Sequence, residues 1–316
     1  MSLLNNLKYR NGHIYPNACI AIALFGLLFS LPVTAQTEQP SPFVFKIEGG
    51  GLHQSESDLT DSSGGFAVDR GFISASLDYG WSFRDSIGIS IGGGKSSYEF
   101  DDLTSFGGGD PWKKIEDTRV SVTWRFGFGE TGSFFLIPTA RVEGEKGASS
   151  GDSTTYGLLA AAAWRISESL TIGPGLGVFS RLEGSTRFFP MLAIDWDITE
   201  RWNLSTGRGL AASQGPGLTL GYKLNEDWSL GISGRYEDIE FRLDDEGTAA
   251  GGVGRDQSIP LVFAARLEPG PKFNLAVFAG IELGGKLKLK DAMGDVIDES
   301  SYDPAPIFGA TFEFRF

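Results

Sequence analysis

Few residues in this sequence have a spacing that could support chemistry, and the clearest is a short glycine–serine motif. Gly88-Ile89-Ser90-Ile91-Gly92 has the G-x-S-x-G form of a hydrolase nucleophile, which needs a strand–turn–helix setting and a nearby histidine. Ser90 instead lies within a stretch of alternating apolar and polar residues. His53, one of two histidines in the chain, lies two predicted strands away. We therefore expect Ser90 to be a small polar side chain of a strand, and we expect no enzymatic activity.

Two further patterns have a chemical form without the required setting. Gly280-x-x-x-x-Gly285-Lys286 matches most of a phosphate-binding loop, but Leu287 replaces the required Ser or Thr. Acidic residues crowd two predicted loops, within 244–246 and 291–299. Carboxylates are ligands that Ca²⁺ prefers, but this spacing fits no EF-hand loop. A solvated acidic rim is the interpretation we favour, and no metal or cofactor is expected.

The composition excludes several classes of protein. The chain has 316 residues and a formal net charge of −13, so it lacks the basic surface of a nucleic-acid-binding protein. A hydrophobic content of 41 % is too high for a disordered chain. A single Cys excludes a disulfide scaffold or a cysteine-rich zinc site.

The first residues are typical of an export signal. Lys8 and Arg10 give a positive start, and an apolar run follows over residues 18–31. Small residues end this segment at Ala35, which predicts cleavage before Gln36. The run is shorter than the about 20 apolar residues that a comfortable membrane-spanning helix needs. An uncleaved anchor is the alternative interpretation.

Beyond this segment the dominant pattern has a period of two. From Ile73 to Phe83, apolar and aromatic residues alternate with Ser, Asp and Gly. Successive side chains of a strand point to opposite faces, so this is a strand with one apolar and one polar face. Its length suits a tilted strand that crosses a membrane. Similar alternation recurs over 120–128, 156–166, 188–198, 218–224, 273–283 and 308–316.

The segments between these strands alternate between short and mostly longer, Gly-rich connections. Six short turns are predicted at 84–86, 129–133, 167–169, 199–201, 225–227 and 268–272. Seven loops are predicted at about 54–70, 101–114, 145–153, 182–187, 208–215, 244–256 and 284–304. Thirteen connections join fourteen strands, with twelve to sixteen as the range, and place both ends of the barrel region on the short-turn side. An even count with short turns at one end is typical of outer-membrane barrels, whose short turns are periplasmic.

A weak repeat supports this register. The segment from Trp81 to Ile87 resembles the segments 164–170, 196–202 and 222–228, each with an aromatic residue before a charged short turn. Six of the seven Trp lie within about five residues of such a turn. Aromatic rings favour the membrane–water interface, so this placement predicts an aromatic girdle at one end.

A soluble β-sandwich is the main structural alternative. The apolar face is free of charge along nearly every predicted strand, and a lipid-facing Arg or Lys at mid-membrane costs roughly 2–4 kcal/mol. Strands in lipid also need a closed sheet, so Phe43–His53 must pair with the strand that ends at Phe316. The sequence thus predicts an all-β protein, a transmembrane antiparallel up-and-down β-barrel.

At this point the chain resembles bacterial outer-membrane β-barrel proteins. The likeness covers the signal, the hairpins and the last strand, and implies a signal peptide at 1–35, a short lead at 36–42 and a barrel at 43–316. It also implies export to the outer membrane and contact with lipid, lipopolysaccharide, periplasmic chaperones and the assembly machinery. The oligomeric state is left open. In that superfamily an apolar last strand with terminal Phe is the assembly signal, which here corresponds to Phe308, Phe312, Phe314 and Phe316.

The polar face, which lines the barrel interior, consists mainly of Gly, Ser, Ala and Thr with scattered charges. Small residues inside fourteen strands should leave space, although the loops at 54–70 and 284–304 are long enough to fold inward. We therefore predict a passive channel for small polar solutes or ions. A non-conducting structural or surface-binding barrel is the alternative. The candidate pore-lining residues are Lys46, Glu48, Asp78, Arg119, Arg125, Arg141, Glu143, Arg165, Asp195 and Asp197.

Overall fold

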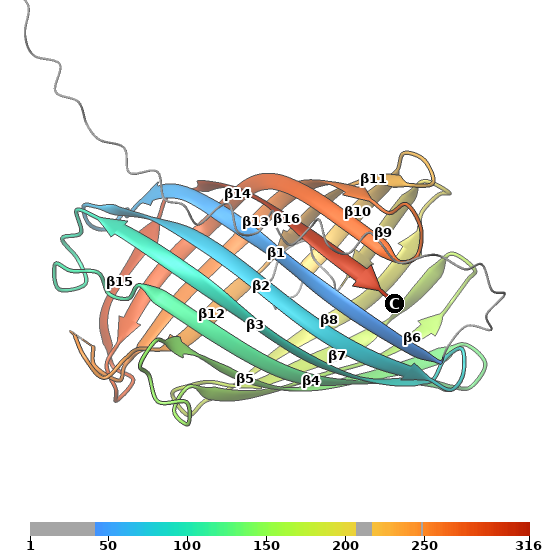
Figure 1. Cartoon of the computed structure of the whole chain (residues 1–316), viewed down its shortest axis with the longest axis horizontal. Helices are drawn as coiled ribbons and strands as arrows, with labels where there is room; N and C mark the ends of the chain where they lie inside the picture. Colours follow the sequence, from blue (N-terminus) through green and yellow to red (C-terminus); the bar gives the residue numbers. More distant parts are fainter. Residues whose placement is uncertain (1–41, 207–216, 248) are drawn as a thin grey trace, which may run out of the picture. The chain divides into compact units, whose positions relative to one another are not determined.

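The computed structural model describes residues 42–206, 217–247 and 249–316, which form one antiparallel β-sheet closed on itself (Figure 1). The predicted signal peptide, the cleavage point between Ala35 and Gln36 and nearly all of the 36–42 lead lie outside the described residues.

The sheet contains sixteen strand segments. Their bounds are β1 Phe43–Asp58, β2 Gly65–Gly80, β3 Ser86–Asp101, β4 Lys114–Phe128, β5 Gly132–Glu145, β6 Thr154–Arg165, β7 Leu170–Ser180, β8 Thr186–Asp197, β9 Trp202–Thr206, β10 Gly217–Lys223, β11 Trp228–Arg235, β12 Glu237–Arg242, β13 Val253–Leu267, β14 Phe273–Lys290, β15 Val296–Tyr302 and β16 Ala305–Arg315. In the described part of the chain, no helix is long and apolar enough to cross a membrane.

The sixteen segments make fourteen barrel strands, because two strands are each interrupted once. β11 and β12 both pair with β13 and are separated only at Tyr236. β15 and β16 both pair with β14. The first and last strands close the barrel in a register that runs from Lys46 opposite Arg315 to Gln54 opposite Ile307. The predicted fourteen-stranded antiparallel barrel is confirmed.

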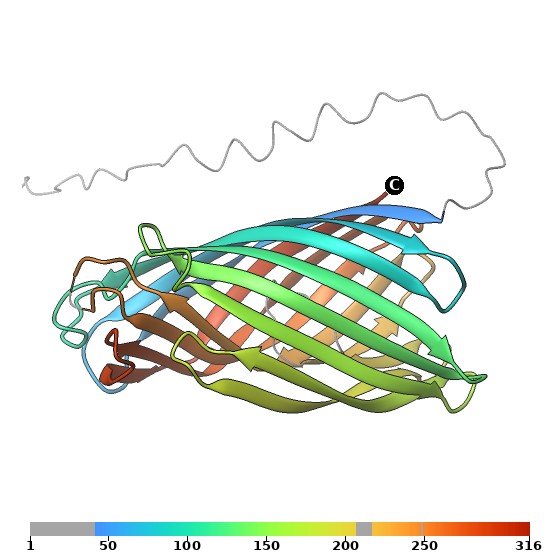
Figure 2. The same cartoon turned by 90° about the horizontal axis from the view of Figure 1, so that it is seen from below.

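The two ends of the barrel differ. Figures 1 and 2 show tight turns at one end, where the chain also terminates at Phe316, and longer loops at the other. Pro42 lies at this short-turn end too, since its carbonyl accepts a hydrogen bond from Gly80. All six predicted short turns fall between consecutive strands as expected.

Two of the predicted loops are instead largely strand. β1 and β2 extend to leave only residues 59–64 between them, and most of 284–304 forms the β14–β15 hairpin. The physical reason is that the period of two continues there: Leu287 and Leu289 are fully buried while the alternating lysines face outward. These segments therefore lengthen the wall, and the expectation that they are long loops able to fold inward is wrong.

The outer surface carries a continuous apolar belt. On β2 and β3 the outward residues between the short turn and mid-strand, such as Ile73, Leu77 and Ile91, are exposed, and they alternate with half-buried inward residues. Six tryptophans form an exposed girdle at the short-turn end, and they are Trp81, Trp124, Trp164, Trp196, Trp202 and Trp228. Beyond the belt, toward the long loops, outward positions become polar, as at Asp69 and Lys95.

The core lies at the long-loop end, inside the barrel. Its members come from β2, β3, β4, β12, β14 and β15 and from the loops beside them. They are Leu59, Phe66, Val68, Tyr98, Phe106, Trp112, Ile115, Phe241, Leu243, Ala249, Leu287, Leu289 and Tyr302, which we name the mouth core. Trp112, the one tryptophan outside the girdle, is 1 % exposed at its centre. The seventh Trp thus stabilises the interior.

Segment β12 makes this core possible because it reaches β5 while staying paired with β13 along its whole length. Its last residue, Arg242, pairs in parallel with Gly144 of β5, although β5 and the β11/β12 strand are the fifth and eleventh of fourteen. Strands so far apart in order lie nearly opposite each other in a closed barrel. β12 therefore crosses the mouth, with Phe241 on the side of the core.

Candidate functional site: the barrel interior

The polar residues nearest the short turns make cross-strand pairs along the interior wall. Lys46 lies 2.8 Å from Asp78 on the next strand, and Ser74 donates to Glu48 at 2.9 Å. On the far side, the amide of Asn203 donates to both Asp195 and Asp197, at 3.0 and 2.9 Å. Both of these aspartates are exposed inside the barrel. The structure thus distributes these five candidate charges around the interior rather than into one ring.

Four candidate arginines lie on β4, β5 and β6. Arg119 and Arg141 are direct cross-strand partners, and Arg141 also contacts Glu143 at 2.6 Å and Asp117 at 3.9 Å. Arg125 donates to the carbonyl of Phe83 at 2.6 Å and thereby holds a short turn in place. Like charges opposite each other destabilise a sheet, so the two carboxylates compensate the Arg119–Arg141 pair.

Arg165 of β6, which like Arg125 lies toward the short turns, differs from Arg125 in its contacts. Its side chain is exposed inside the barrel and makes no hydrogen bond or ion pair with another described residue. Arg165 therefore presents a positive charge to the interior, with Asp195 two strands away in the same row.

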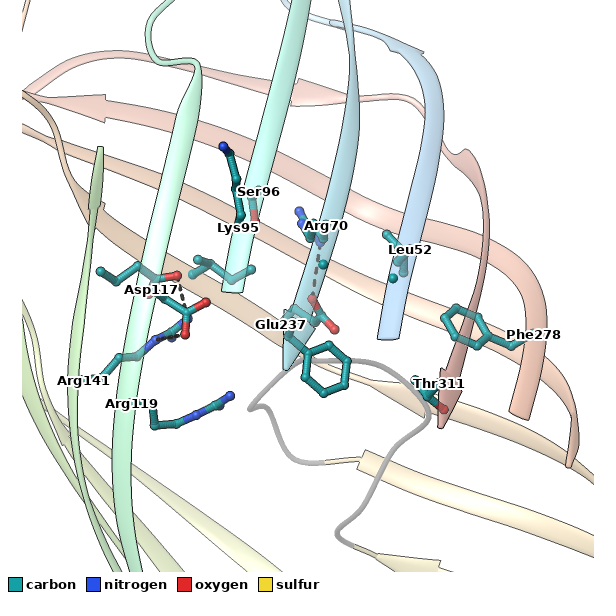
Figure 3. Close-up of a pocket in the computed structure, with 15 residues that line it drawn as sticks. Leu52, Arg70, Lys95, Ser96, Asp117, Arg119, Arg141, Glu237, Phe278 and Thr311 are labelled. Carbon is teal, nitrogen blue, oxygen red and sulfur yellow. Dashed lines mark hydrogen bonds and ion pairs between the residues drawn. The ribbon is translucent and has the colours of Figure 1, made fainter. Parts of the chain in front are cut away.

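A cavity of about 60 Å³ lies where the two halves of the interior meet. Figure 3 shows Arg119, Arg141 and Asp117 on one wall and Leu52, Phe278 and Thr311 on the other, with Arg70 and Glu237 between them. This volume holds several water molecules, since one water needs roughly 10–15 Å³. The cavity combines charged and apolar walls.

A buried charge cluster separates this cavity from the mouth core. Arg70 of β2 lies 2.6 Å from Asp256 of β13, with Glu237 at 3.6 Å and Glu282 at 3.8 Å. Tyr98 and Tyr302 each donate to Asp256, at 2.9 and 3.0 Å. The cluster links walls that are several strands apart and narrows the barrel at this level.

The two tyrosines of the cluster are neutral hydrogen-bond donors. Both lie beyond the apolar belt, on the long-loop side. Burial raises the pKa of Tyr98 and of Tyr302 well above the usual value for a phenol, and the charge of Asp256 acts in the same direction. The buried carboxylate of Asp256 is thus held by one guanidinium and two hydroxyl groups.

Ion pairs attach the other side of β12 to the β7–β8 end of the wall. Arg242 donates to Glu183 at 3.1 Å and to the carbonyls of Leu182 and Asp152 at 3.2 and 3.1 Å. Arg181 also binds Glu240, and Arg187 binds Asp238. These contacts hold β12 across the mouth.

The G-x-S-x-G motif forms part of a regular strand. Ser90 lies in the middle of β3, opposite Ser76 and Ser121. His53 contacts Asp69 at 2.8 Å, and its ring lies against Phe308 on the outer surface. Over the described ranges, no three His, Cys, Asp or Glu side chains are grouped as metal ligands.

The residues that most shape the interior were absent from the sequence prediction. Arg70, Glu237, Asp256 and Glu282 were not among its candidates, because they lie near predicted loops and are far apart in the chain. The alternation of apolar and polar residues could have identified them, because it continues past the predicted ends of the strands that carry these four residues. The contact between Arg70 and Asp256 spans 186 residues and has no local signature.

The closed sheet, the uncharged outward belt and the tryptophan girdle define a membrane-spanning β-barrel of porin-like architecture. No protein-family model matches the chain, and no curated protein matches its sequence.

Solved structures with a similar outline are outer-membrane proteins. An outer membrane channel from Pseudomonas putida F1 aligns with a TM-score of 0.49 and 11 % identity, over 90 % of this chain and 100 % of that one. A FadL homologue from Pseudomonas aeruginosa gives 0.45 and 11 %, over 86 % and 90 %. The translocator domain of the autotransporter NalP from Neisseria meningitidis gives 0.36 and 11 %, over 89 % and 90 %. The barrel assignment of this chain rests on its own strand register and belt.

Proposed function

We propose that this protein is an outer-membrane channel for small solutes, with β12 and the mouth core narrowing its long-loop end. The observation that carries the proposal is the contrast between the two faces of one wall. The outward face is apolar and exposed, whereas the inward face near the short turns carries exposed charges such as Arg165 and Asp195. A barrel that served only as an anchor would need no charge-lined interior.

The proposal includes an orientation and a route of assembly. In outer-membrane barrels the short turns are periplasmic, so both described chain ends would face the periplasm and the mouth core the outside. Phe308, Phe312 and Phe314 lie on the outward face of β16 and Phe316 follows its last residue, where assembly machinery would recognise them. Residues 1–35 would direct export and be removed before Gln36.

The test is single-channel conductance of the protein, purified from outer membranes of a Gram-negative host and inserted into planar bilayers. Stepwise, stable conductance is the expected result, and the ten candidate pore-lining residues then become targets for selectivity measurements. A folded barrel that stays silent, with heat-modifiable migration in gels as the check of folding, contradicts the proposal.

One observation favours the alternative, a non-conducting barrel. The mouth core and the Arg70 cluster fill much of the long-loop end, and β12 is fixed across it. If this end is closed at all times, the acidic loops outside would be the functional surface. Phe241→Ala removes a fully buried ring of the mouth core and distinguishes the two functions. If the unaltered protein is silent and this variant conducts, the protein is a channel closed at its mouth. If both are silent, the non-conducting barrel is supported.

A further inference from the structure

The interior wall formed by β5 to β8 carries an apolar patch that faces the barrel lumen. Its six residues, which we name the lumen patch, are Phe135, Ile137, Leu159, Phe179, Phe189 and Met191. Each alternates with an outward neighbour of the belt, such as Leu158 or Phe188, and each is half-buried, so part of its surface remains exposed inside the barrel.

Strand register makes this patch continuous. One row across the four strands runs from Ile137 through Leu159 and Gly177 to Phe189. The next row toward the short turns contains Phe135 and Met191, with Ala161 and Gly175 between them in register. Neighbouring strands lie about 4.8 Å apart, so the patch is about 14 Å wide.

Glycines make the surface of the patch flat. A Cβ atom on Gly177 would lie 2.2 Å from the ring of Phe189, and one on Gly157 would lie 2.4 Å from the ring of Phe179. The two rings are therefore laid over neighbouring strands, and they stack with centroids 5.5 Å apart and planes 7° from parallel. Such a surface suits another flat apolar group.

An apolar surface of this kind inside a charged, solvated lumen has no structural need. Exposed apolar patches rimmed by polar groups mark ligand-binding sites, because the free energy of removing them from water becomes available on binding. The adjoining wall of β2 to β4, with Ser74, Ser90 and Thr123 at inward positions, has no such patch. Across the lumen, the apolar cluster around Phe278 on β13, β14 and β16 is buried, unlike the lumen patch. The simplest explanation for the exposed lumen patch is that a solute binds there and covers it.

The charge around the patch indicates the rest of that solute. Arg125 lies in register opposite Phe135, and Arg165 lies on the β6 strand toward the short turns. In the parts of the chain that the structure describes, neither guanidinium is within 4.0 Å of a carboxylate, whereas Arg187 beside Phe189 is bound to Asp238. The short-turn edge of the patch is therefore positive along β4 to β6, where it is complementary to an anion, and negative on β8, where Asp195 lies in register with Arg165 through Thr171.

We propose that the lumen patch binds solutes that combine a flat apolar ring with an anionic group. Aromatic carboxylates are the chemical class that fits this description. The ring would lie over the row from Phe135 to Met191, the row of the patch nearest the short turns, and the anion would face Arg125 and Arg165. This inference rests on the proposed channel function, since it names the solute class that the channel admits. It also provides a binding site that can be measured without conductance.

The experiment is an equilibrium titration of the purified full barrel in detergent, followed by saturation-transfer NMR. Benzoate is the probe, acetate is the anion without a ring, and benzyl alcohol is the ring without a charge. We expect saturable binding of benzoate at least five-fold tighter than that of either control. Leu159→Ser should weaken benzoate binding at least five-fold, and Arg165→Gln should weaken benzoate but not benzyl alcohol.

Leu158→Ser is the matched control, because Leu158 is the neighbouring residue on the same strand and faces outward. Equal effects of the two serine variants, or benzoate binding no tighter than acetate, would overturn the proposal. Conductance distinguishes this failure from that of the channel. A conducting barrel without benzoate binding refutes the patch alone. A silent barrel with Leu159-dependent binding supports the patch and refutes the channel.

Discussion

The mouth core and the lumen patch use the same local arrangement with opposite outcomes. In the core, Phe241 lies over Gly254 and Tyr302 over Gly285, each directly across a strand pair, and both rings are nearly fully buried. In the patch, Phe179 and Phe189 lie over Gly157 and Gly177 in the same way, yet both residues stay partly exposed.

The difference shows that a ring laid over a glycine does not by itself determine whether that ring is buried. At the mouth, β12 and the neighbouring loops supply a second layer, so the rings become part of a core. Along β5 to β8 no described segment of the chain contributes to a buried core there, and the rings remain available. Burial stabilises the first region, and exposure gives the second its ability to bind.

The largest expected effect distinguishes buried from lumen-exposed ion pairs. Asp256→Ala removes the acceptor that Arg70, Tyr98 and Tyr302 share. Arg70 keeps Glu237 at 3.6 Å and Glu282 at 3.8 Å, but each buried hydroxyl left without an acceptor costs about 1–3 kcal/mol. Asp78→Ala, which removes the partner of Lys46 nearer the short turns, should cost less, because both side chains of this pair are partly exposed. Urea unfolding in lipid vesicles measures both free energies. Equal losses of unfolding free energy would show that the Arg70 cluster and the Lys46–Asp78 pair are equally shielded from water.

A smaller effect is expected from filling the glycine positions. Gly285→Ala puts a methyl group 1.9 Å from the ring of Tyr302, which is fixed by its bond to Asp256, and such overpacking costs about 1–3 kcal/mol. Gly177→Ala should cost less, because the ring of Phe189 can move into the lumen. The same unfolding assay compares the variants, and benzoate titration reports the altered patch. A larger loss for Gly177→Ala would contradict the assigned exposure.

Charge removal in the lumen should alter selectivity rather than stability. Arg119→Gln combined with Arg141→Gln removes two positive charges from the wall of the cavity, so the channel should shift toward cations. The reversal potential in a KCl gradient measures this shift. Lys114→Gln, on the outward face of β4, is the control and should leave selectivity unchanged. An identical reversal potential in the double variant would exclude these arginines from the conduction pathway.

The smallest effect concerns the outer surface of the long-loop end. Hydrogen bonds from Lys288 and Lys286 lower the pKa of Glu299 from 4.5 to about 2. A lowered pKa in the folded state means that these contacts stabilise the β14–β15 hairpin above pH 4.5 and that this stabilisation is lost as the pH falls toward 2. The protection factors of the hairpin amides in hydrogen exchange, which correct for the intrinsic pH dependence of exchange, should therefore fall on acidification. Glu299→Gln should remove most of that pH dependence, and an unchanged profile would contradict it.

The sequence alone determined the wall of this barrel. The period of two, the six charged short turns and the tryptophans beside them predicted fourteen antiparallel strands closed between Phe43 and Phe316. These features are local, because each hairpin joins chain neighbours and each strand needs only its own alternation to place one face in lipid. The predicted strands ended too early near the mouth, because segments rich in charged residues and glycine were assigned to loops.

Only the tertiary structure decided how the interior is filled. Trp112 is buried in the mouth core while the other six tryptophans are exposed, although nothing in its local sequence separates it from a loop residue. Arg242 reaches Gly144 and Arg70 reaches Asp256 across the barrel, between strands that are not neighbours. Such contacts depend on the closed curvature of the whole sheet, which brings distant strands face to face and which no alternation pattern records.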